Sequence, residues 1–342
     1  MESVPLIRTR DLTKQFSISA GKKIRKTKFT AVNGVSLTIN KGEVFGLVGE
    51  SGCGKSTLAS LMLRLANSDS GSIHYGDTDI TALSYGKMRQ LRRNMQIVFQ
   101  DPYDSLDPRF TLRQIMEEPL KIHRSGSRAE RLAKITAMFE SVGLDADMLR
   151  RYPHQLSGGQ RQRLCIARSL ILSPEFLICD EAVAALDVSV QAQILNLLLD
   201  LKDEFNLTYL FISHNLAVVK FMADRIGVMY FGNLVELADT EALFNDVRHP
   251  YTAALLSSVP DPDPLADNRR DILRSGVPSL IDPPGGCVFH PRCNYADDRC
   301  SREPPELRDI GGNHFVACHK AQDEHGSRDA RRITQTEESR PI

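Results

Sequence analysis

The sequence lacks both a net charge and a long hydrophobic run. Its 342 residues include 43 Lys and Arg against 43 Asp and Glu, so the basic excess of a typical nucleic-acid binding protein is missing. No apolar stretch approaches the roughly 18 residues that a membrane-spanning helix needs. The N-terminus shows no basic segment followed by an apolar one. We therefore expect no nucleic-acid partner, no transmembrane helix and no secretory signal.

A disulfide framework is absent as well. The seven cysteines are an odd number and include no Cys-x-x-Cys pair, which favours free thiols in a reducing compartment. Hydrophobic residues make up 42% and charged residues 25%, the proportions of a soluble globular protein with a sizeable core. These features predict a folded, cytosolic chain.

Continuous apolar runs recur along the first 230 residues and predict an α/β domain. Such runs are typical of parallel strands that are covered on both faces of the sheet. They lie at residues 44–48, 96–99, 176–179, 209–212 and 226–230. The weaker alternation over Leu6–Gln15 predicts an edge strand, and the basic segment 22–28 predicts a solvated loop between two strands.

Composition divides the chain into several parts. Residues 1–250 are expected to form the α/β domain, with a helical insert at 102–174. The expected helices of the insert lie at 112–120, 128–142 and 159–172. Residues 251–320 are rich in Pro and Gly and hold four of the seven cysteines, which predicts an extension with little regular structure. The polar residues 321–342 are expected to be disordered.

A segment with the pattern G-x-x-x-x-G-K-[ST] follows the first apolar run and precedes a helix. This context is what a phosphate-binding loop requires, because its backbone N–H groups surround the phosphates. Lys55 would contact the β- and γ-phosphate oxygens, and Ser56 would ligate Mg²⁺. The residues expected to bind a nucleoside triphosphate are Gly49, Glu50, Ser51, Gly52, Cys53, Gly54, Lys55, Ser56 and Thr57.

One residue of this loop, Cys53, is expected to be reactive. A position near a helix N-terminus lowers the pKa of a thiol and favours the thiolate. Alkylating agents should then inactivate the protein, and bound nucleotide should protect it.

Polar residues follow three further apolar runs. Asp180 and Glu181 end one strand, where a carboxylate suits Mg²⁺ and its neighbour can polarise an attacking water. His214 ends another and is placed to contact a γ-phosphate. Gln100 follows a third strand, where the helical insert begins. Each residue taken singly also fits a structural role.

The segment Leu156–Gln160 reads LSGGQ and precedes a helix. Ser157 is a natural N-cap, and Gly158 and Gly159 leave the first N–H groups of that helix open to an anion. Alone, the segment equally fits an ordinary capped helix.

In this order and spacing, the motifs resemble those of ATP-binding cassette (ABC) ATPases over about residues 6–245. The resemblance implies an α/β P-loop NTPase (RecA-like) cassette with a helical subdomain insert, which binds ATP and Mg²⁺ and hydrolyses ATP. The implied roles are Walker A for Gly49–Ser56, the Q-loop for Gln100, the signature motif for Ser157, Gly158, Gly159 and Gln160, Walker B for Phe176–Asp180, the catalytic carboxylate for Glu181, the D-loop for Asp187 and the switch histidine for His214.

The resemblance also implies that one chain holds only half of each site. Two cassettes of this family pair head to tail, so the signature motif of one meets the ATP bound by the other. Adenine stacks on an aromatic residue after the first strand, here Phe16 or, alternatively, Phe29. Ala182 and Ala184 replace a common Pro and Ser, and Asn215 replaces a common Asp. These departures leave the hydrolysis rate open.

Three further segments resemble the ATP-binding subunits of oligopeptide and dipeptide importers. They are residues 98–109, 248–256 and 286–293. The resemblance implies a second, different ATPase chain, two membrane permeases and an extracytoplasmic binding protein as partners. The chain would lie peripherally on the cytoplasmic face of a bacterial inner membrane. Relatives that import nickel, glutathione or opines, and soluble ABC ATPases outside transport, are the alternatives.

The extension carries a set of four cysteines, Cys287, Cys293, Cys300 and Cys318. Their spacing is a poor match to a zinc ribbon, and composition alone favours reduced thiols. Resemblance to the importer branch implies a 4Fe–4S cluster on these four residues, since four thiolates are what such a cluster needs. A zinc site that recruits His290 or His319 is the alternative.

Overall fold

The computed structural model describes residues 4–19, 26–257 and 283–321, and its centre is a sheet of eight strands in the order β11-β12-β10-β9-β3-β8-β7-β6. The strands from β9 to β6 are parallel, and β10, β12 and β11 continue the sheet in antiparallel pairs. The bounds are β3 Val44–Val48, β6 Met95–Val98, β7 Phe176–Asp180, β8 Thr208–Ile212, β9 Arg225–Tyr230, β10 Asn233–Asp239, β11 Arg308–Asp309 and β12 Phe315–Val316.

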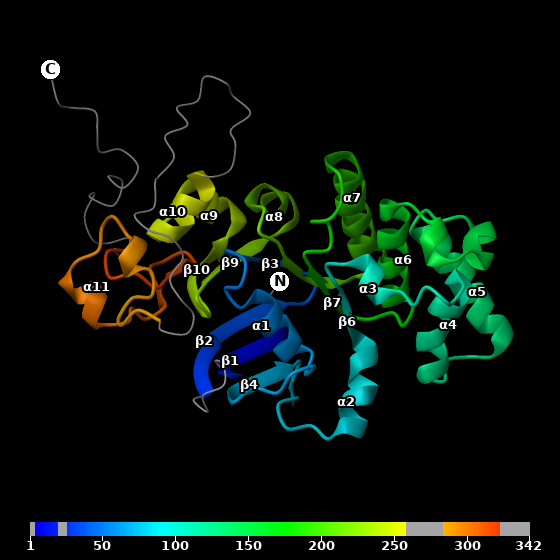
Figure 1. The fold of residues 1–342 in the computed structure, drawn as a ribbon, viewed down its shortest axis with the longest axis horizontal. Coiled ribbons are helices and arrows are strands. Elements are labelled where there is room, and N and C mark those ends of the chain that lie inside the picture. The colour runs from blue at the N-terminus through cyan, green and yellow to red at the C-terminus, as the bar shows by residue number, and fades with distance from the viewer. Residues whose placement is uncertain (1–3, 20–25, 258–282, 322–342) are drawn as a thin grey trace, which may run out of the picture.

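Helices cover one face of this sheet, and a second sheet with α1 covers the other (Figure 1). Side chains of one strand therefore alternate between two cores: Val44 and Val48 join one, and Phe45 and Leu47 join the other. This is why the parallel strands read as unbroken apolar runs. The helices outside the insert are α1 Lys55–Met62, α2 Tyr85–Leu91, η1 Arg92–Asn94, α7 Val188–Phe205, α8 Leu216–Met222, α9 Thr240–Asn245 and α10 Pro250–Ser257.

The second sheet is antiparallel and has the order β2-β1-β4-β5. Its strands are β1 Pro5–Ser19, β2 Lys26–Asn40, β4 Ser70–Tyr75 and β5 Thr78–Asp79. The expectation of an edge strand at Leu6–Gln15 is wrong, because β1 pairs with β2 on one side and β4 on the other. Most of the basic segment 22–28 lies outside the described residues.

The helical insert forms one end of the molecule (Figure 1). Its elements are α3 Pro102–Ser105, α4 Leu112–Ile122, α5 Arg128–Ser141, η2 Ala146–Arg150, η3 Pro153–Gln155 and α6 Gly158–Leu170. The three expected helices are present. Capping boxes begin α4, α5 and α6, with Thr111, Ser127 and Ser157 as N-caps, which explains why their starts are predictable.

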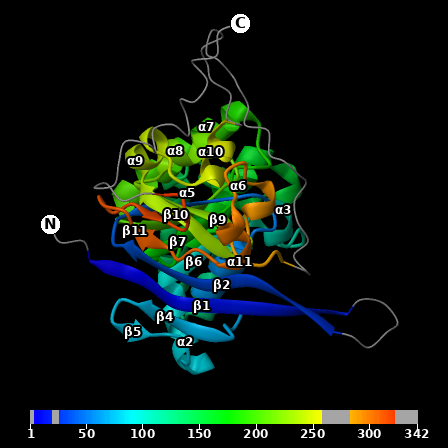
Figure 2. The same ribbon diagram turned by 90° about the vertical axis from the view of Figure 1, so that its left-hand side faces the viewer.

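The C-terminal extension packs beside β9 and β10 (Figures 1 and 2). It contains η4 His290–Arg292, α11 Asp298–Arg302, β11 and β12. Its two short strands extend the central sheet through the β10–β12 pair, so the prediction of little regular structure is only partly right. The predicted disorder of residues 321–342 falls almost wholly outside the described part of the chain. Within that part, we find no helix that is long and apolar enough to cross a membrane.

Candidate functional site

The glycine-rich loop joins the end of β3 to the start of α1. Gly54 precedes the helix with a φ of 108°, and no side chain caps the first N–H groups of α1. Those groups are therefore free to bind an anion. A Cβ at Gly49 would lie 2.2 Å from the Met229 carbonyl oxygen, so the loop depends on glycine at this close approach.

Lys55 is buried inside this loop. Its Nζ donates to the carbonyl oxygens of Gly49 at 2.8 Å and Glu50 at 3.0 Å. The loop backbone thus holds the ammonium group at the uncapped N-terminus of α1, where a triphosphate would meet both. This is the positive site that the motif predicts.

Cys53 does not match the prediction of a reactive thiolate. The residue is only 3% exposed, and burial raises the pKa of its thiol even though Lys55 lies nearby and lowers it. The Cys53 Sγ lies 3.7 Å from Lys55 Nζ. Desolvation outweighs the helix N-terminus here, which argues against the thiolate expected from sequence position.

Ser56 and Asp180 form the second part of the site. The Ser56 hydroxyl donates to Asp180 Oδ1 at 3.1 Å, which links the start of α1 to the end of β7. Burial raises the pKa of Asp180, although the bond from Ser56 opposes this. A hydroxyl and a carboxylate at this separation are hard oxygen ligands of the kind Mg²⁺ prefers.

Glu181 lies next to this pair and is held by two other elements. Gln100 Nε2 donates to Glu181 Oε2 at 2.9 Å, and His214 Nδ1 lies 3.5 Å from the same oxygen. The backbone of Glu181 is left-handed, with φ of 49°, and its N–H donates to the Ile212 carbonyl at 3.0 Å. Three strand ends therefore meet at one carboxylate, although the three residues are far apart in sequence.

The LSGGQ segment and Asp187 share one surface. Ser157 caps α6 and forms a capping box with Gln160, while Asp187 caps α7 by accepting from the Val190 N–H at 3.0 Å. A Cβ at Gly159 would lie 2.7 Å from Val190 Cγ1, so the starts of α6 and α7 touch. Ser157 and Asp187 are exposed.

The two aromatic candidates for adenine stacking are cross-strand neighbours. Phe16 on β1 pairs with Phe29 on β2, and their ring centroids are 5.7 Å apart at an angle of 28°. Phe16 keeps 39% of its surface exposed. Either ring can therefore offer a face, and the geometry does not separate the two candidates.

The cysteine set gathers within the extension, and none of its four described residues forms a disulfide. Burial and the charges of the other three cysteines raise the pKa of Cys287 to about 11. The four sulfurs are thus close enough to interact electrostatically. Across the described ranges, however, no group of three or more His, Cys, Asp or Glu side chains is arranged to hold a metal ion.

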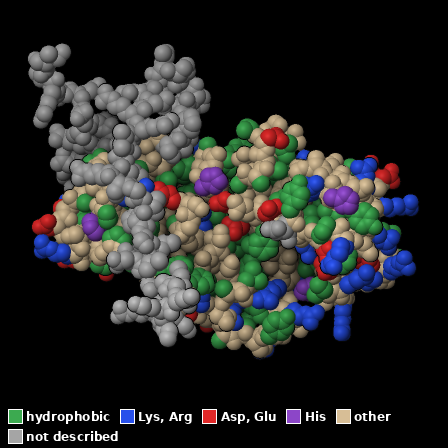
Figure 3. Space-filling model, viewed as in Figure 1, with side chains coloured by type: hydrophobic (Ala, Val, Ile, Leu, Met, Phe, Trp, Pro, Cys, Tyr) green, Lys and Arg blue, Asp and Glu red, His purple; other side chains and the backbone are tan. Residues whose placement is uncertain are grey.

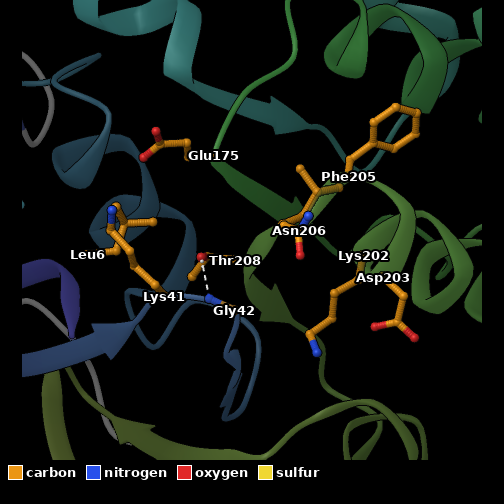
Figure 4. Close-up of a pocket in the computed structure, with 10 residues that line it drawn as sticks. Leu6, Lys41, Gly42, Glu175, Lys202, Asp203, Phe205, Asn206 and Thr208 are labelled. Atoms are coloured by element: carbon orange, nitrogen blue, oxygen red, sulfur yellow. Dashed lines mark hydrogen bonds between the residues drawn. The ribbon is translucent and has the colours of Figure 1, made fainter. Parts of the chain in front are cut away.

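A cavity of about 560 Å³ lies at the opposite edge of the central sheet (Figure 4). Glu175, just before β7, and Thr208, the first residue of β8, line it, and Thr208 Oγ1 accepts from the Gly42 N–H at 2.9 Å. Ligands of open α/β sheets bind beyond the carboxyl ends of the strands. The cavity is at the amino ends, so it is not part of the candidate site.

Comparison with known proteins identifies the family. The ABC transporter model matches residues 32–184, and the model of the oligopeptide/dipeptide transporter C-terminal region matches residues 235–300. The oligopeptide transport ATP-binding protein AppF of Bacillus subtilis (strain 168) is 48% identical over 318 residues, which span 92% of this chain and 97% of that protein. The chain belongs to the ABC transporter family.

Solved structures agree with this assignment. The dimeric bacterial ABC transporter cassette MJ0796 is 28% identical, with a TM-score of 0.60 over 68% of this chain and 98% of that one. The cbiO1 protein of Clostridium perfringens, part of the ABC transporter complex cbiONQ, is 25% identical, with a TM-score of 0.61 over 72% and 92% of the two chains. The predicted α/β cassette fold and the prediction of an ABC-type ATPase are confirmed.

Sequence reasoning missed several contacts of this ABC ATPase. Asn215, noted only as a departure, caps α8 by accepting from the Ala217 N–H at 3.0 Å, the same role an Asp would serve. Arg292 and Tyr251 reach Glu50 of the phosphate-binding loop. Both lie in segments noted for the importer branch, but no spacing rule links them to a loop some 200 residues earlier.

Proposed function

We propose that this protein is the ATP-hydrolysing subunit of an importer of oligopeptides or dipeptides. The observation that carries the proposal is the match of residues 235–300 to the C-terminal region of oligopeptide/dipeptide transporters. The similarity to AppF over almost the whole of both chains supports it. The strand-end arrangement around Glu181 supplies the hydrolytic chemistry that such a subunit needs.

The proposed roles of the residues follow from their positions. The loop Gly49–Thr57 binds the phosphates of ATP through backbone N–H groups and Lys55. Ser56 and Asp180 would hold Mg²⁺, which would neutralise phosphate charge during hydrolysis. Phe16, with Phe29 as the alternative, stacks on adenine.

Glu181 acts in the proposed hydrolysis as general base. It takes a proton from water as the water oxygen bonds to the γ-phosphorus, and the bond from that phosphorus to the β–γ bridging oxygen breaks, which leaves ADP and phosphate. Gln100 and His214 contact the same carboxylate oxygen, so they orient Glu181. His214 is also free to meet the γ-phosphate, because its side chain is 58% exposed.

A second ATPase chain would complete the site. Ser157, Gly158, Gly159 and Gln160 form the capped N-terminus of α6, and Asp187 lies beside them as the N-cap of α7. Val188 at this surface is 84% exposed, so its side chain is accessible to a partner. We propose that this surface faces the ATP of the partner cassette, and that the partner is a different chain.

Membrane permeases would dock beside the Q-loop. A hollow of about 620 Å³ in the helical insert lies just after Gln100 and is lined by Tyr103, Phe110 and Arg168 among others. Tyr103 is largely exposed, and Lys and Arg side chains gather at this end of the molecule (Figure 3). A movement of Gln100 would be transmitted to a permease bound here. We propose two permeases and an extracytoplasmic binding protein, with the chain on the cytoplasmic face of a bacterial inner membrane.

The cysteine set is proposed to bind a 4Fe–4S cluster. Cys287, Cys293, Cys300 and Cys318 would be the ligands, and the cluster would staple the extension together. The proposal is supported by four cysteines that lie near one another. It is not supported by a formed metal site, because the described side chains are not arranged as one. Iron content and visible absorbance after anaerobic purification test this. Protein that carries neither, and whose melting temperature is unchanged by Cys300→Ser, contradicts it.

Transport assays in the native bacterium test the proposed cargo. Deletion of the gene should abolish growth on di- and oligopeptides as sole nitrogen source, and a plasmid copy should restore it. A plasmid copy with Glu181→Gln should not. Normal peptide uptake with loss of nickel, glutathione or opine uptake would reassign the cargo. Normal uptake of all four would contradict the transport function.

A further inference from the structure

The C-terminal extension contacts the phosphate-binding loop through a bidentate ion pair. Arg292 Nη1 donates to Glu50 Oε2 at 2.9 Å, and Arg292 Nη2 donates to Glu50 Oε1 at 2.9 Å. The Arg292 side chain is only 7% exposed and that of Glu50 is 27% exposed. A planar guanidinium that meets both carboxylate oxygens is the most directional form of ion pair.

A second group beyond the matched cassette region holds the same residue. The hydroxyl of Tyr251, at the start of α10, accepts from the Glu50 N–H at 2.8 Å. The Glu50 carbonyl accepts from Lys55 within the loop. Every polar group of Glu50 is therefore engaged, its carboxylate by the extension and its N–H by α10.

The aromatic side chains around Arg292 fix its position. The ring of Tyr230 lies under the guanidinium at 5.8 Å, and its hydroxyl accepts from Arg292 Nη1 at 3.4 Å. Phe289 packs edge-on against Tyr230 at 5.3 Å and contacts Tyr251 at 5.5 Å. All three rings are fully buried. A buried guanidinium in such surroundings is stable only with its counter-charge, so the ion pair and the aromatic cluster require each other.

The charge of Glu50 gives this contact a consequence for ligand binding. Glu50 is the one acidic residue of the loop from Gly49 to Ser56, and the loop is the part of the chain that must accept a polyanion. An unpaired carboxylate there would repel the phosphates, and the repulsion would grow with ligand charge. Arg292 neutralises the carboxylate and fixes it against the extension.

We propose that Arg292 and Tyr251 are positioning residues for nucleotide binding, which hold the phosphate-binding loop in place and screen its single negative charge. This inference rests on the proposed role of that loop in binding ATP. On this inference, the segment Gly286–Cys293 contributes to nucleotide binding through Arg292, in addition to any role of its cysteines. This also makes the extension part of the nucleotide site, although Arg292 lies more than 230 residues from the loop in sequence.

The test uses the full-length chain with Arg292→Met, Glu50→Gln and the double variant. Arg299→Met is the matched control, because Arg299 is an exposed arginine of the same extension that pairs with Glu303 at 3.0 Å. Titration calorimetry with MgATP and MgADP measures affinity, and thermal melting without nucleotide measures folding. We expect Arg292→Met to weaken MgATP binding on the order of tenfold and MgADP binding less. The MgATP affinity of the double variant should lie within about threefold of the wild-type value. The control Arg299→Met should bind MgATP as wild type does.

Folded Arg292→Met that binds MgATP within about twofold of wild type overturns the inference, as does a double variant as weak as Arg292→Met. If Arg292→Met does not fold, Tyr251→Phe replaces it, since this change keeps the ring and removes only the hydroxyl. Tyr251→Phe should weaken MgATP binding about threefold, and unchanged affinity overturns the inference. A folded wild-type chain that binds no nucleotide overturns the proposed function itself.

Discussion

At the scale of single residues, the two carboxylates at the end of β7 are treated differently by their surroundings. Asp180 is buried beside Ser56, and burial raises its pKa. Glu181 is turned out of the strand by a left-handed backbone and meets Gln100 and His214. Two acids that are adjacent in sequence thus face different partners, which supports a metal ligand and a general base as separate roles.

Glu181→Gln should stop hydrolysis without stopping ATP binding. A general base contributes roughly 10²- to 10⁴-fold to the rate, so phosphate release should fall at least 100-fold while MgATP affinity stays within a few-fold of wild type. The matched control is Glu175→Gln, a change at the opposite end of the same strand, which should leave phosphate release unchanged. Residual hydrolysis above a tenth of the wild-type rate would contradict the role of Glu181.

His249 should make the stability of the protein depend on pH. The residue is buried, its Nδ1 accepts from the Tyr251 N–H at 3.0 Å, and burial lowers its pKa to about 4. A histidine with a lowered pKa stabilises the folded state fully above its unfolded pKa near 6.5. That contribution is lost as the pH falls toward 4, at about 1.4 kcal/mol per pH unit.

When the pH falls from 7.5 to 5, protonation of this histidine in the unfolded state should therefore lower the free energy of unfolding by about 2 kcal/mol. The comparison variant is His249→Asn, which keeps an acceptor for the Tyr251 N–H and cannot ionise in this range. Denaturant unfolding at both pH values should show a smaller pH dependence for the variant. Equal pH dependence in the two proteins would rule out His249 as the source.

At the scale of elements, the start of α6 serves both folding and function. Ser157 caps this helix in the same way that Ser127 caps α5: each hydroxyl accepts an N3 backbone N–H at 3.3 Å. An N-cap serine replaced by alanine costs about 1 kcal/mol. Only the α6 cap lies in the proposed interface with the partner's ATP.

Ser157→Ala and Ser127→Ala should therefore destabilise the chain equally and differ in activity. We expect each to lower the free energy of unfolding by about 1 kcal/mol. Phosphate release by the assembled transporter should fall at least tenfold for Ser157→Ala alone. Equal activity of the two variants would mean that Ser157 is merely a helix cap.

Local signals explain which elements were predictable. The strands with two buried faces read as apolar runs, and α4, α5 and α6 begin at capping boxes that sequence displays directly. The position of β1 inside a second sheet was not predictable, because its partner β4 follows it by more than 50 residues. Pairing over such distances leaves no local pattern.

At the scale of the whole molecule, the site depends on parts that are remote in sequence. The resemblance to ABC ATPases implied that Asp180, Glu181, Gln100 and His214 serve one ATP site, and the structure brings them together because the carboxyl ends of parallel strands meet at one edge of a sheet. The burial of Cys53 and the contact of Arg292 with Glu50 could not be predicted. Both follow from tertiary packing of β9, α10 and the extension around the loop.

The complete molecule is proposed to work only within an assembly. On this proposal, the signature surface meets a second cassette, and the Q-loop junction contacts a membrane permease. The neutral net charge and the match to the oligopeptide/dipeptide transporter C-terminal region both favour a transporter over a nucleic-acid-linked ATPase.

Purification of the tagged chain from gently solubilised native membranes tests this most directly, with its stoichiometric partners identified by mass spectrometry. We predict two polytopic membrane proteins and a second, different ABC ATPase in equal amounts with this chain. Recovery from the soluble fraction alone, in company with ribosomes or DNA-repair proteins, would contradict the transport function and leave only the ATPase.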